Sequence, residues 1–320
     1  MEGLRAVTPL PTKGNAFLVV GDLNVDLVGQ LPRLPGPDEE VAMSALAISA
    51  GGTAGNTAVA LARLGVRAAV LSAVGSDVLG DMLVRMLAEE GVDARWCLRS
   101  SRPTGLCFAA VEPGGERRLL THRGANRDLT PADVADEALA WADAVHMTGV
   151  DPAVAEAVVH KARKAGRPLS FDPGNMMAAA HPDTVLRVGA AAWITFVSRT
   201  EARLLTGTTT PAAVARRLAG AGWRRTVLKL GEEGSVLLVD GEVGPHVPAF
   251  RVPVVDTIGA GDAFDAGFLW ACARGCELET CARYASAVAA MAIGAWGGQA
   301  GLPTAREVEA FVQGRAAHGG

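Results

Sequence analysis

One segment late in the chain carries the residue types that phosphoryl transfer requires. It reads DTIGAGDAF from Asp256 to Phe264, follows an expected strand over residues 252–255 and opens a long apolar helix. Small residues at a helix start let backbone N–H groups converge on an anion, and the helix dipole adds partial positive charge there. Asp262 stands in the first turn, where its carboxylate could accept the proton of an attacking hydroxyl. We therefore predict a general base, Asp262, beside an anion hole formed by Gly259, Ala260 and Gly261.

A second glycine-rich segment, GGTAGNTA from Gly51 to Ala58, opens another expected helix. Asn56 in its first turn offers both a donor and an acceptor to a polyol. Asn24 and Asp26 follow the first strand two residues apart, so both side chains should point to one face. Because open α/β sheets bind ligands at such strand ends, we predict a hydroxyl-binding site here. A solvated turn and a plain helix start remain the alternatives for these two segments.

Strands and helices alternate around these segments, which is typical of a mostly parallel sheet covered by helices on both faces. We expect strands at residues 16–20, 68–74, 144–148, 169–171, 193–197, 226–230, 235–239 and 246–255. Helices are expected at residues 57–64, 77–90, 152–165, 211–221, 261–274, 278–295 and 304–313.

Two segments interrupt this alternation, because residues 39–49 and 104–121 are strand-like with no helix between them. The second contains the turn signal Pro113-Gly114-Gly115. We predict a small antiparallel lid built from about residues 36–50 and 103–124, inserted in a single α/β domain over residues 14–315. A lid of this kind is a plausible cover for a binding site.

Composition narrows the function classes. The 320 residues are 49% hydrophobic and carry a net charge of −4, which argues against a nucleic-acid partner. No apolar run is long enough to span a membrane, so we expect a cytoplasmic protein without a membrane partner. Five cysteines indicate reduced thiols rather than a disulfide framework. Cys272, Cys276 and Cys281 match no zinc pattern and are expected to pack in helices.

The two glycine-rich segments resemble the two signatures of the ribokinase-like (PfkB) carbohydrate kinase family, over about residues 16–313. The resemblance implies a three-layer α/β/α sandwich with a β lid, ATP and Mg²⁺ as cofactors, and a homodimer formed through the lid. It implies that Asp262 is the base and that magnesium lies near Glu201, bound through water. It also implies that Asp256 is a ligand for a monovalent cation such as K⁺. Gly124-Ala125-Asn126 matches a short family motif after the lid.

Binding residues are assigned by the same resemblance. The substrate set is Asn24, Asp26, Gly51, Gly52, Thr53, Asn56, Phe108 and Arg123. The nucleotide set is Ser198, Lys229, Leu230, Gly231, Gly234 and Ser286.

Three departures from the family pattern matter. Ser198 begins the stretch Ser198-Arg199-Thr200-Glu201, where the family usually has Asn, which puts tight magnesium coordination in question. Thr53 replaces the Lys of ribokinase, and no Glu ends the strand before Gly149, which weakens ribose as the substrate. Arg123 precedes the Gly-Ala-Asn motif where proline is common, either as a solvated lid residue or as a contact to an acidic sugar.

The function we predict is ATP-dependent phosphorylation of a hydroxyl on a sugar or sugar-like small molecule. A nucleoside kinase is an alternative within the same chemistry, with Phe108 as a candidate platform for the base. A non-catalytic sugar sensor is an alternative of another class, motivated by Ser198. A nicotinamide-dependent oxidoreductase is disfavoured, because the first strand runs into Asp22-Leu23-Asn24 and not into G-x-G-x-x-G.

Overall fold

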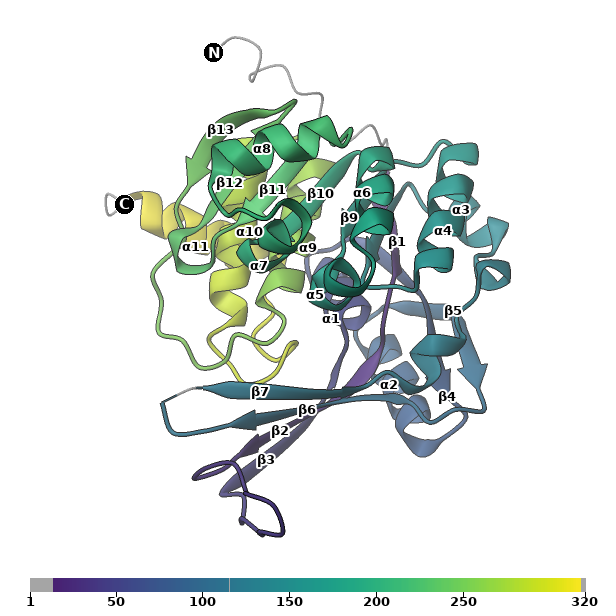
Figure 1. The fold of residues 1–320 in the computed structure, drawn as a ribbon, viewed down its shortest axis with the longest axis vertical. Helices are drawn as coiled ribbons and strands as arrows, with labels where there is room; N and C mark the ends of the chain where they lie inside the picture. Colours follow the sequence, from purple (N-terminus) through teal and green to yellow (C-terminus); the bar gives the residue numbers. More distant parts are fainter. Residues whose placement is uncertain (1–13, 115, 318–320) are drawn as a thin grey trace.

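The computed structural model describes residues 14–114 and 116–317. Its main feature is a nine-stranded sheet with the order β13-β12-β11-β10-β9-β8-β1-β4-β5 (Figure 1). The strands are β1 (Ala16–Val20), β4 (Arg67–Gly75), β5 (Asp93–Ser100), β8 (Ala144–Thr148), β9 (Leu169–Asp172), β10 (Ile194–Ser198), β11 (Arg225–Lys229), β12 (Ser235–Val239) and β13 (Glu242–Val247). Among the described residues of this sheet, only the pairs β11–β12 and β12–β13 are antiparallel. The expected mostly parallel sheet is therefore confirmed.

Helices cover both faces of this sheet. One face carries α1 (Thr53–Arg63), α2 (Val78–Glu89), α9 (Ala260–Ala273), α10 (Leu278–Ala292) and α11 (Ala305–Ala317). The other carries α3 (Asp136–Trp141), α4 (Pro152–Lys164), α5 (Gly174–Ala180), α6 (Pro182–Ala191), α7 (Arg199–Thr206) and α8 (Pro211–Gly220). Because side chains alternate along a strand, β1 directs Phe17 and Val19 into the first core and Leu18 and Val20 into the second. The three-layer α/β/α prediction is confirmed.

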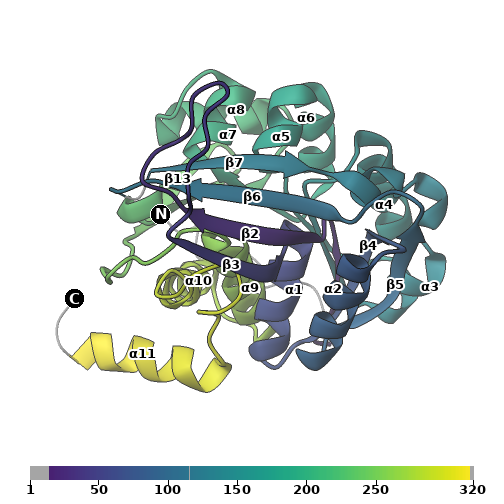
Figure 2. The same ribbon diagram turned by 90° about the horizontal axis from the view of Figure 1, so that it is seen from below.

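The lid is a separate four-stranded sheet with the order β3-β2-β6-β7, crossing the end of the main sheet where β1 leaves it (Figures 1 and 2). Its strands are β2 (Asn24–Gln30), β3 (Ala45–Gly51), β6 (Gly105–Val111) and β7 (Arg117–His122). The hairpin expected between β6 and β7 is present, and its Gly115 lies outside the described residues.

Three details of the prediction differ from the structure. Residues 39–44 form no strand, and Asn24 and Asp26, expected at the end of the first strand, belong to a separate strand, β2, which begins at Asn24. The pairing of β2 with β6 is parallel, so the lid is not fully antiparallel.

The strand expected over residues 246–255 ends at Val247. Beyond it, the amides of Val255 and Asp256 both donate to the carbonyl of Ile293, at the end of α10, and not to a neighbouring strand. The segment from Asp256 to Phe264 is therefore reached through an extended connection anchored on a helix. No helix in the described part of the chain is long and apolar enough to cross a membrane.

Candidate active site

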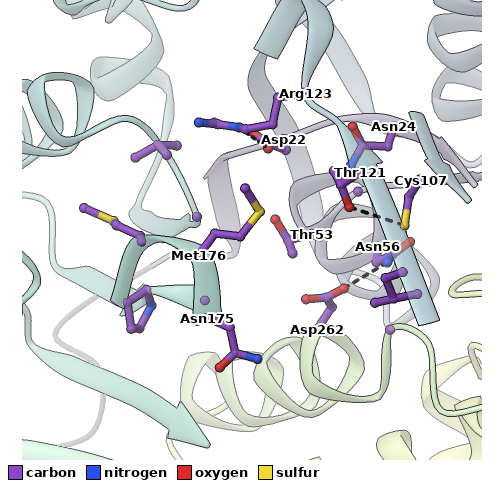
Figure 3. A pocket seen from close by; sticks show the side chains of 18 of the residues that line it. Asp22, Asn24, Thr53, Asn56, Cys107, Thr121, Arg123, Asn175, Met176 and Asp262 are labelled. Carbon is purple, nitrogen blue, oxygen red and sulfur yellow. Dashed lines mark hydrogen bonds and ion pairs between the residues drawn. The ribbon is translucent and has the colours of Figure 1, made fainter. Parts of the chain in front are cut away.

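A pocket of about 490 Å³ lies between the lid and the ends of β1, β8 and β9 (Figure 3). The lid contributes residues of β2, β6 and β7, and the main body contributes the starts of α1, α4, α5 and α9. Of the predicted substrate and catalytic residues, those in its lining are Asn24, Asp26, Gly52, Thr53, Asn56, Arg123, Gly259 and Asp262. The structure thus brings together residues that are up to 238 positions apart in the chain, from Asn24 to Asp262.

Asp262 lies in the first turn of α9 with its carboxylate at the pocket. Asn56 Nδ2 donates to Asp262 Oδ2 at 2.9 Å, and Gln299 Nε2 donates to Asn56 Oδ1 at 3.2 Å. Burial raises the pKa of Asp262 to about 7, while the hydrogen bond from Asn56 acts in the opposite direction. The carboxylate is thus held in one orientation and has a pKa suited to accepting a proton near neutral pH.

The start of α9 has the features of an anion hole. Gly259 precedes the helix with φ of 74°, a left-handed conformation that favours glycine, and no side chain caps the helix. The amide of Ala260 already donates to Thr257 O at 3.3 Å, so the predicted contribution of Ala260 was wrong in detail. The amides of Gly261 and Asp262, in the uncapped first turn, remain as donors for an anion, and Gly261 is exposed.

The polar wall of the pocket comes from β2 and α1. Asp26 is buried, and within the described residues its carboxylate accepts no hydrogen bond. Burial, and then the charge of Asp256, raises the pKa of Asp26 to about 7. Thr53 Oγ1 is also buried without a partner in the described part of the chain. A substrate rich in hydroxyls would supply hydrogen-bond partners for these two polar groups.

Asn24 and Arg123 are held by neighbours. Asn126 Nδ2 donates to Asn24 Oδ1 at 2.9 Å, which gives the Gly-Ala-Asn motif a role in fixing the start of β2. Arg123 forms two hydrogen bonds with Asp22, at 2.9 and 3.0 Å, and its side chain is 17% exposed. Arg123 is therefore an ion-paired residue of the pocket wall rather than a solvated lid residue.

Two predicted substrate residues do not line the pocket. Phe108 lies on the outer face of the lid, because its neighbours Cys107 and Ala109 point inward and successive side chains of a strand alternate. Gly51 acts by its lack of a side chain, since a Cβ there would stand 2.0 Å from Asp26 Oδ2. The glycine leaves the space that the Asp26 carboxylate occupies.

The family model for pfkB family carbohydrate kinases matches residues 15–305 of this chain. The chain belongs to this family. It is 32% identical over 302 residues to an ATP-dependent ribose-1-phosphate kinase of Halopiger xanaduensis, covering 93% of this chain and 98% of the relative. It is 30% identical over 298 residues to a nucleoside kinase of Methanothermobacter thermautotrophicus, covering 92% of this chain and 95% of that relative.

The crystal structure of a putative ribokinase from Agrobacterium tumefaciens has the same fold, with a TM-score of 0.85, 26% identity and coverage of 95% of this chain and 99% of that one. This PfkB kinase is accordingly a phosphotransferase that uses ATP and acts on a hydroxyl group of a sugar or sugar-like small molecule.

The nucleotide set of the PfkB kinase lies outside the pocket lining, around the ends of β10 and β11 and on α10. Ser198 ends β10, Lys229 ends β11, and Leu230, Gly231 and Gly234 form the loop that follows. Ser286 on α10 donates to Pro248 O at 3.5 Å.

Lys229 is placed differently from the prediction. Its side chain is 14% exposed, and its Nζ donates to Asp172 Oδ2 at 2.6 Å and to Asp265 Oδ1 at 3.0 Å. Burial would lower the pKa of Lys229, but Asp172 and Asp265 together raise it above its ordinary value. A Cβ on Gly261 would lie 3.4 Å from Nζ, so the ammonium group lies close to the anion hole. Its first contacts are therefore two carboxylates of the protein.

The two predicted metal ligands also have protein partners. Glu201 and Ser198 form a capping box at the start of α7, in which the Ser198 amide donates to Glu201 Oε2 at 2.5 Å. Asp256 accepts hydrogen bonds from the amides of Ile258 and Gly297, at 3.0 and 2.9 Å, and pairs with Arg117 at 3.4 Å. Because the Arg117 guanidinium already supplies a positive charge at Asp256, the arrangement does not fit the predicted ligand of a monovalent cation.

Several site residues were missed from the sequence. Asp265 and Gln299 had no recognisable motif around them, and Asp172 was not singled out. Helix α5, which brings Asn175 and Met176 to the pocket, was not expected, although Asp172-Pro173-Gly174 at the end of β9 is a turn signal that could have marked its start.

Proposed function

We propose that Asp262 is the general base for transfer of the γ-phosphoryl group of ATP to a primary hydroxyl of a substrate held under the lid. The observation that carries this proposal is the Asp262 carboxylate itself, oriented by Asn56, facing the pocket and placed beside the uncapped start of α9. The hydroxyl proton passes to Asp262 as the hydroxyl oxygen bonds to the γ-phosphorus, and the bond from that phosphorus to the bridging oxygen of ADP breaks. The amides of Gly261 and Asp262 stabilise the charge on the transferring group.

A divalent metal fits this site only with help from water and phosphate. No three His, Cys, Asp or Glu side chains converge as a metal cage within the described residues. Magnesium commonly keeps several waters and takes one or two carboxylates beside substrate phosphates. Burial, and then the charge of Asp172, raises the pKa of Glu201, so Glu201 lies in a region where negative charge accumulates. We propose Mg²⁺ as the metal, with Glu201 holding it through water, where it would neutralise phosphate charge.

The test of this function is Asp262→Asn. We expect kcat to fall at least about a hundredfold, because the general base is lost, while ATP affinity and the melting temperature stay close to those of the wild type. Release of ADP under saturating substrate, with calorimetry for ATP, measures both. Near wild-type kcat in this variant would refute the assignment of Asp262.

A free sugar is our first candidate for the substrate, because the polar groups of β2 and α1 suit a polyol. A nucleoside is the second, and Met176 favours it. This side chain is 61% exposed, and Figure 3 shows it lying across the pocket from Asp262. A methionine provides an adaptable apolar surface against which a base could pack.

A panel of sugars, sugar phosphates and nucleosides assayed for ADP release would separate the two candidates. It should include fructose, 2-keto-3-deoxygluconate, ribose and ribose 1-phosphate. For a nucleoside substrate, Met176→Ala should raise KM several-fold, whereas for a free sugar it should leave KM unchanged.

The assembly and location of the protein are further parts of the proposal. We propose a homodimer formed through the outer face of the lid, supported by the exposure of Leu46, Ile48 and Leu120, which are 51%, 59% and 65% exposed. We propose a cytoplasmic location, supported by five free cysteines, which are typical of reducing compartments.

A further inference from the structure

Asp256 is a buried carboxylate at the start of the loop that leads into α9. Its side chain is 5% exposed, and among the described residues its only ion pair is the one with Arg117. A buried carboxylate is costly unless a positive charge and hydrogen bonds compensate it. The amides of Ile258 and Gly297 supply the hydrogen bonds, and the guanidinium of Arg117 supplies the charge.

Arg117 reaches Asp256 from the lid. It is the first residue of β7 and lies opposite Val111 of β6. Leu119 and Thr121, two and four residues further along β7, line the pocket, so Arg117 belongs to the inner face of the lid and lines the pocket as well. The ion pair therefore connects the lid to the segment that carries Gly259 and Asp262.

The neighbouring Arg118 shows that this contact depends on strand geometry and not on general positive charge. Arg118 points to the opposite face of β7, where it pairs with Glu112 within the same hairpin. Asp256 also acts on the substrate side of the pocket, because its charge adds to the raised pKa of Asp26. A cation at Asp256 thus limits the negative charge beside the Asp26 carboxylate.

We propose that Arg117 is a positioning residue that supplies the counter-charge of Asp256 in place of a monovalent cation, and so holds the loop before α9 in its closed-lid geometry. This inference rests on the proposed role of Asp262. It predicts that phosphotransfer needs no K⁺ as long as Arg117 is present, and that removal of the guanidinium creates a need for a small cation.

The experiment compares the wild type with Arg117→Ala, Arg117→Lys and the matched control Arg118→Ala. Each is assayed in a buffer whose monovalent cation is tetramethylammonium, which is too large for a buried carboxylate, and again with added K⁺ or low millimolar guanidinium chloride. The kinetic readout is KM and kcat. The melting temperature in the same buffers gives a second readout that does not depend on activity.

We expect the wild type and Arg118→Ala to be insensitive to K⁺. In tetramethylammonium, Arg117→Ala should lose between about tenfold and a hundredfold in kcat/KM, the range for a misplaced catalytic segment, and K⁺ or guanidinium should restore much of it. Its melting temperature should rise with K⁺, and Arg117→Lys should keep most of the activity.

A wild type that requires K⁺, or an Arg117→Ala variant that matches it in every buffer, would overturn the proposal. If Arg117→Ala does not fold, the K⁺ response of the wild type and the activity of Arg117→Lys still decide the question. Failure of the base assignment would be seen separately, as full activity of Asp262→Asn, while the cation response of Arg117→Ala would remain a test of the ion pair alone.

Discussion

At the scale of single residues, Asp262 is subject to two opposing influences. Burial favours its protonated form, whereas the hydrogen bond from Asn56 favours the carboxylate. As the proposed base, Asp262 accepts a proton only when deprotonated, so kcat/KM should fall about tenfold for each pH unit below the pKa near 7.

The variant Asn56→Ala removes the hydrogen bond that favours the ionised form of Asp262. In Asn56→Ala the pKa of Asp262 should rise, and the acid limb of the profile of kcat/KM against pH should move to higher pH. Gln299→Ala is the matched control, because it removes the residue that orients Asn56 but not the donor to Asp262. It should give a smaller displacement in the same direction. An acid limb at the wild-type position in Asn56→Ala would show that another group sets it.

Asp26 combines a role in binding with a cost in stability. Its pKa is raised to about 7 in the folded protein, so the folded state holds this proton more tightly than the unfolded state does. That contribution to stability is fully present below pH 4 and is lost as the pH rises to 7, a change of roughly 4 kcal/mol at 1.36 kcal/mol per pH unit.

Asp26→Asn should therefore be more stable than the wild type at pH 8, with a difference that shrinks toward pH 4. Its KM for the substrate should rise strongly while ATP affinity is unchanged. Urea unfolding at the two pH values, together with calorimetry, tests both parts. Equal unfolding free energies of the two proteins at pH 8 would contradict the first part, and a loss of ATP affinity would contradict the second.

At the scale of elements, Glu201 at the start of α7 has two possible roles, helix capping and magnesium binding, and one variant can separate them. Glu201 closes a capping box with Ser198, and we also propose that it holds magnesium through water. Glu201→Gln keeps an acceptor for the Ser198 amide but removes the charge.

The melting temperature of Glu201→Gln should stay near that of the wild type, while the Mg²⁺ concentration for half-maximal rate should increase. Glu201→Ala should in addition lose about 1 kcal/mol of stability with the cap. Ser198→Asn should lower the Mg²⁺ requirement, because a carboxamide reaches further than a hydroxyl and still caps a helix. If Glu201→Gln titrates like the wild type, Glu201 serves only the helix.

How much the sequence could predict also differs by element. Strands such as β1 and β8 were predicted with their observed bounds, because each is a local apolar run bounded by polar or turn-forming residues. Strand β2 was not recognised, since its partner β6 comes from a distant part of the chain and the two Asx residues near its start resemble a turn. The segment after Val247 has the composition of a strand but no edge to pair with.

The site residues show the same difference between local motifs and long-range contacts. Asp262 and Asn56 lie in local motifs and were found. Phe108 was assigned to the wrong face of the lid, because the register of β6 depends on its pairing with β2. The partners Gln299 and Arg117 could not be found from spacing, since each acts across more than a hundred residues of chain.

At the scale of the whole molecule, the lid has two faces with different requirements. Its inner face closes the pocket, and its outer face carries a row of apolar residues in register across the four strands. The row consists of Ile48, Leu27, Phe108 and Leu120. An exposed apolar sheet face of this kind is typical of an interface, and a second copy of the same face would cover it by two-fold symmetry.

The wild type should therefore behave as a dimer at micromolar concentration, and Ile48→Lys with Leu120→Lys should make it a monomer. Light scattering on a sizing column measures this, with Val243→Lys as a control, because Val243 is 42% exposed on β13, which Figure 1 shows at the opposite end of the molecule from the lid. Since the lid also carries Asp26 and Arg117, loss of the partner should loosen the lid and raise KM for the substrate more than KM for ATP. A wild type that is monomeric over this range, or a double variant that remains dimeric, would show that the outer face of the lid does not form the interface.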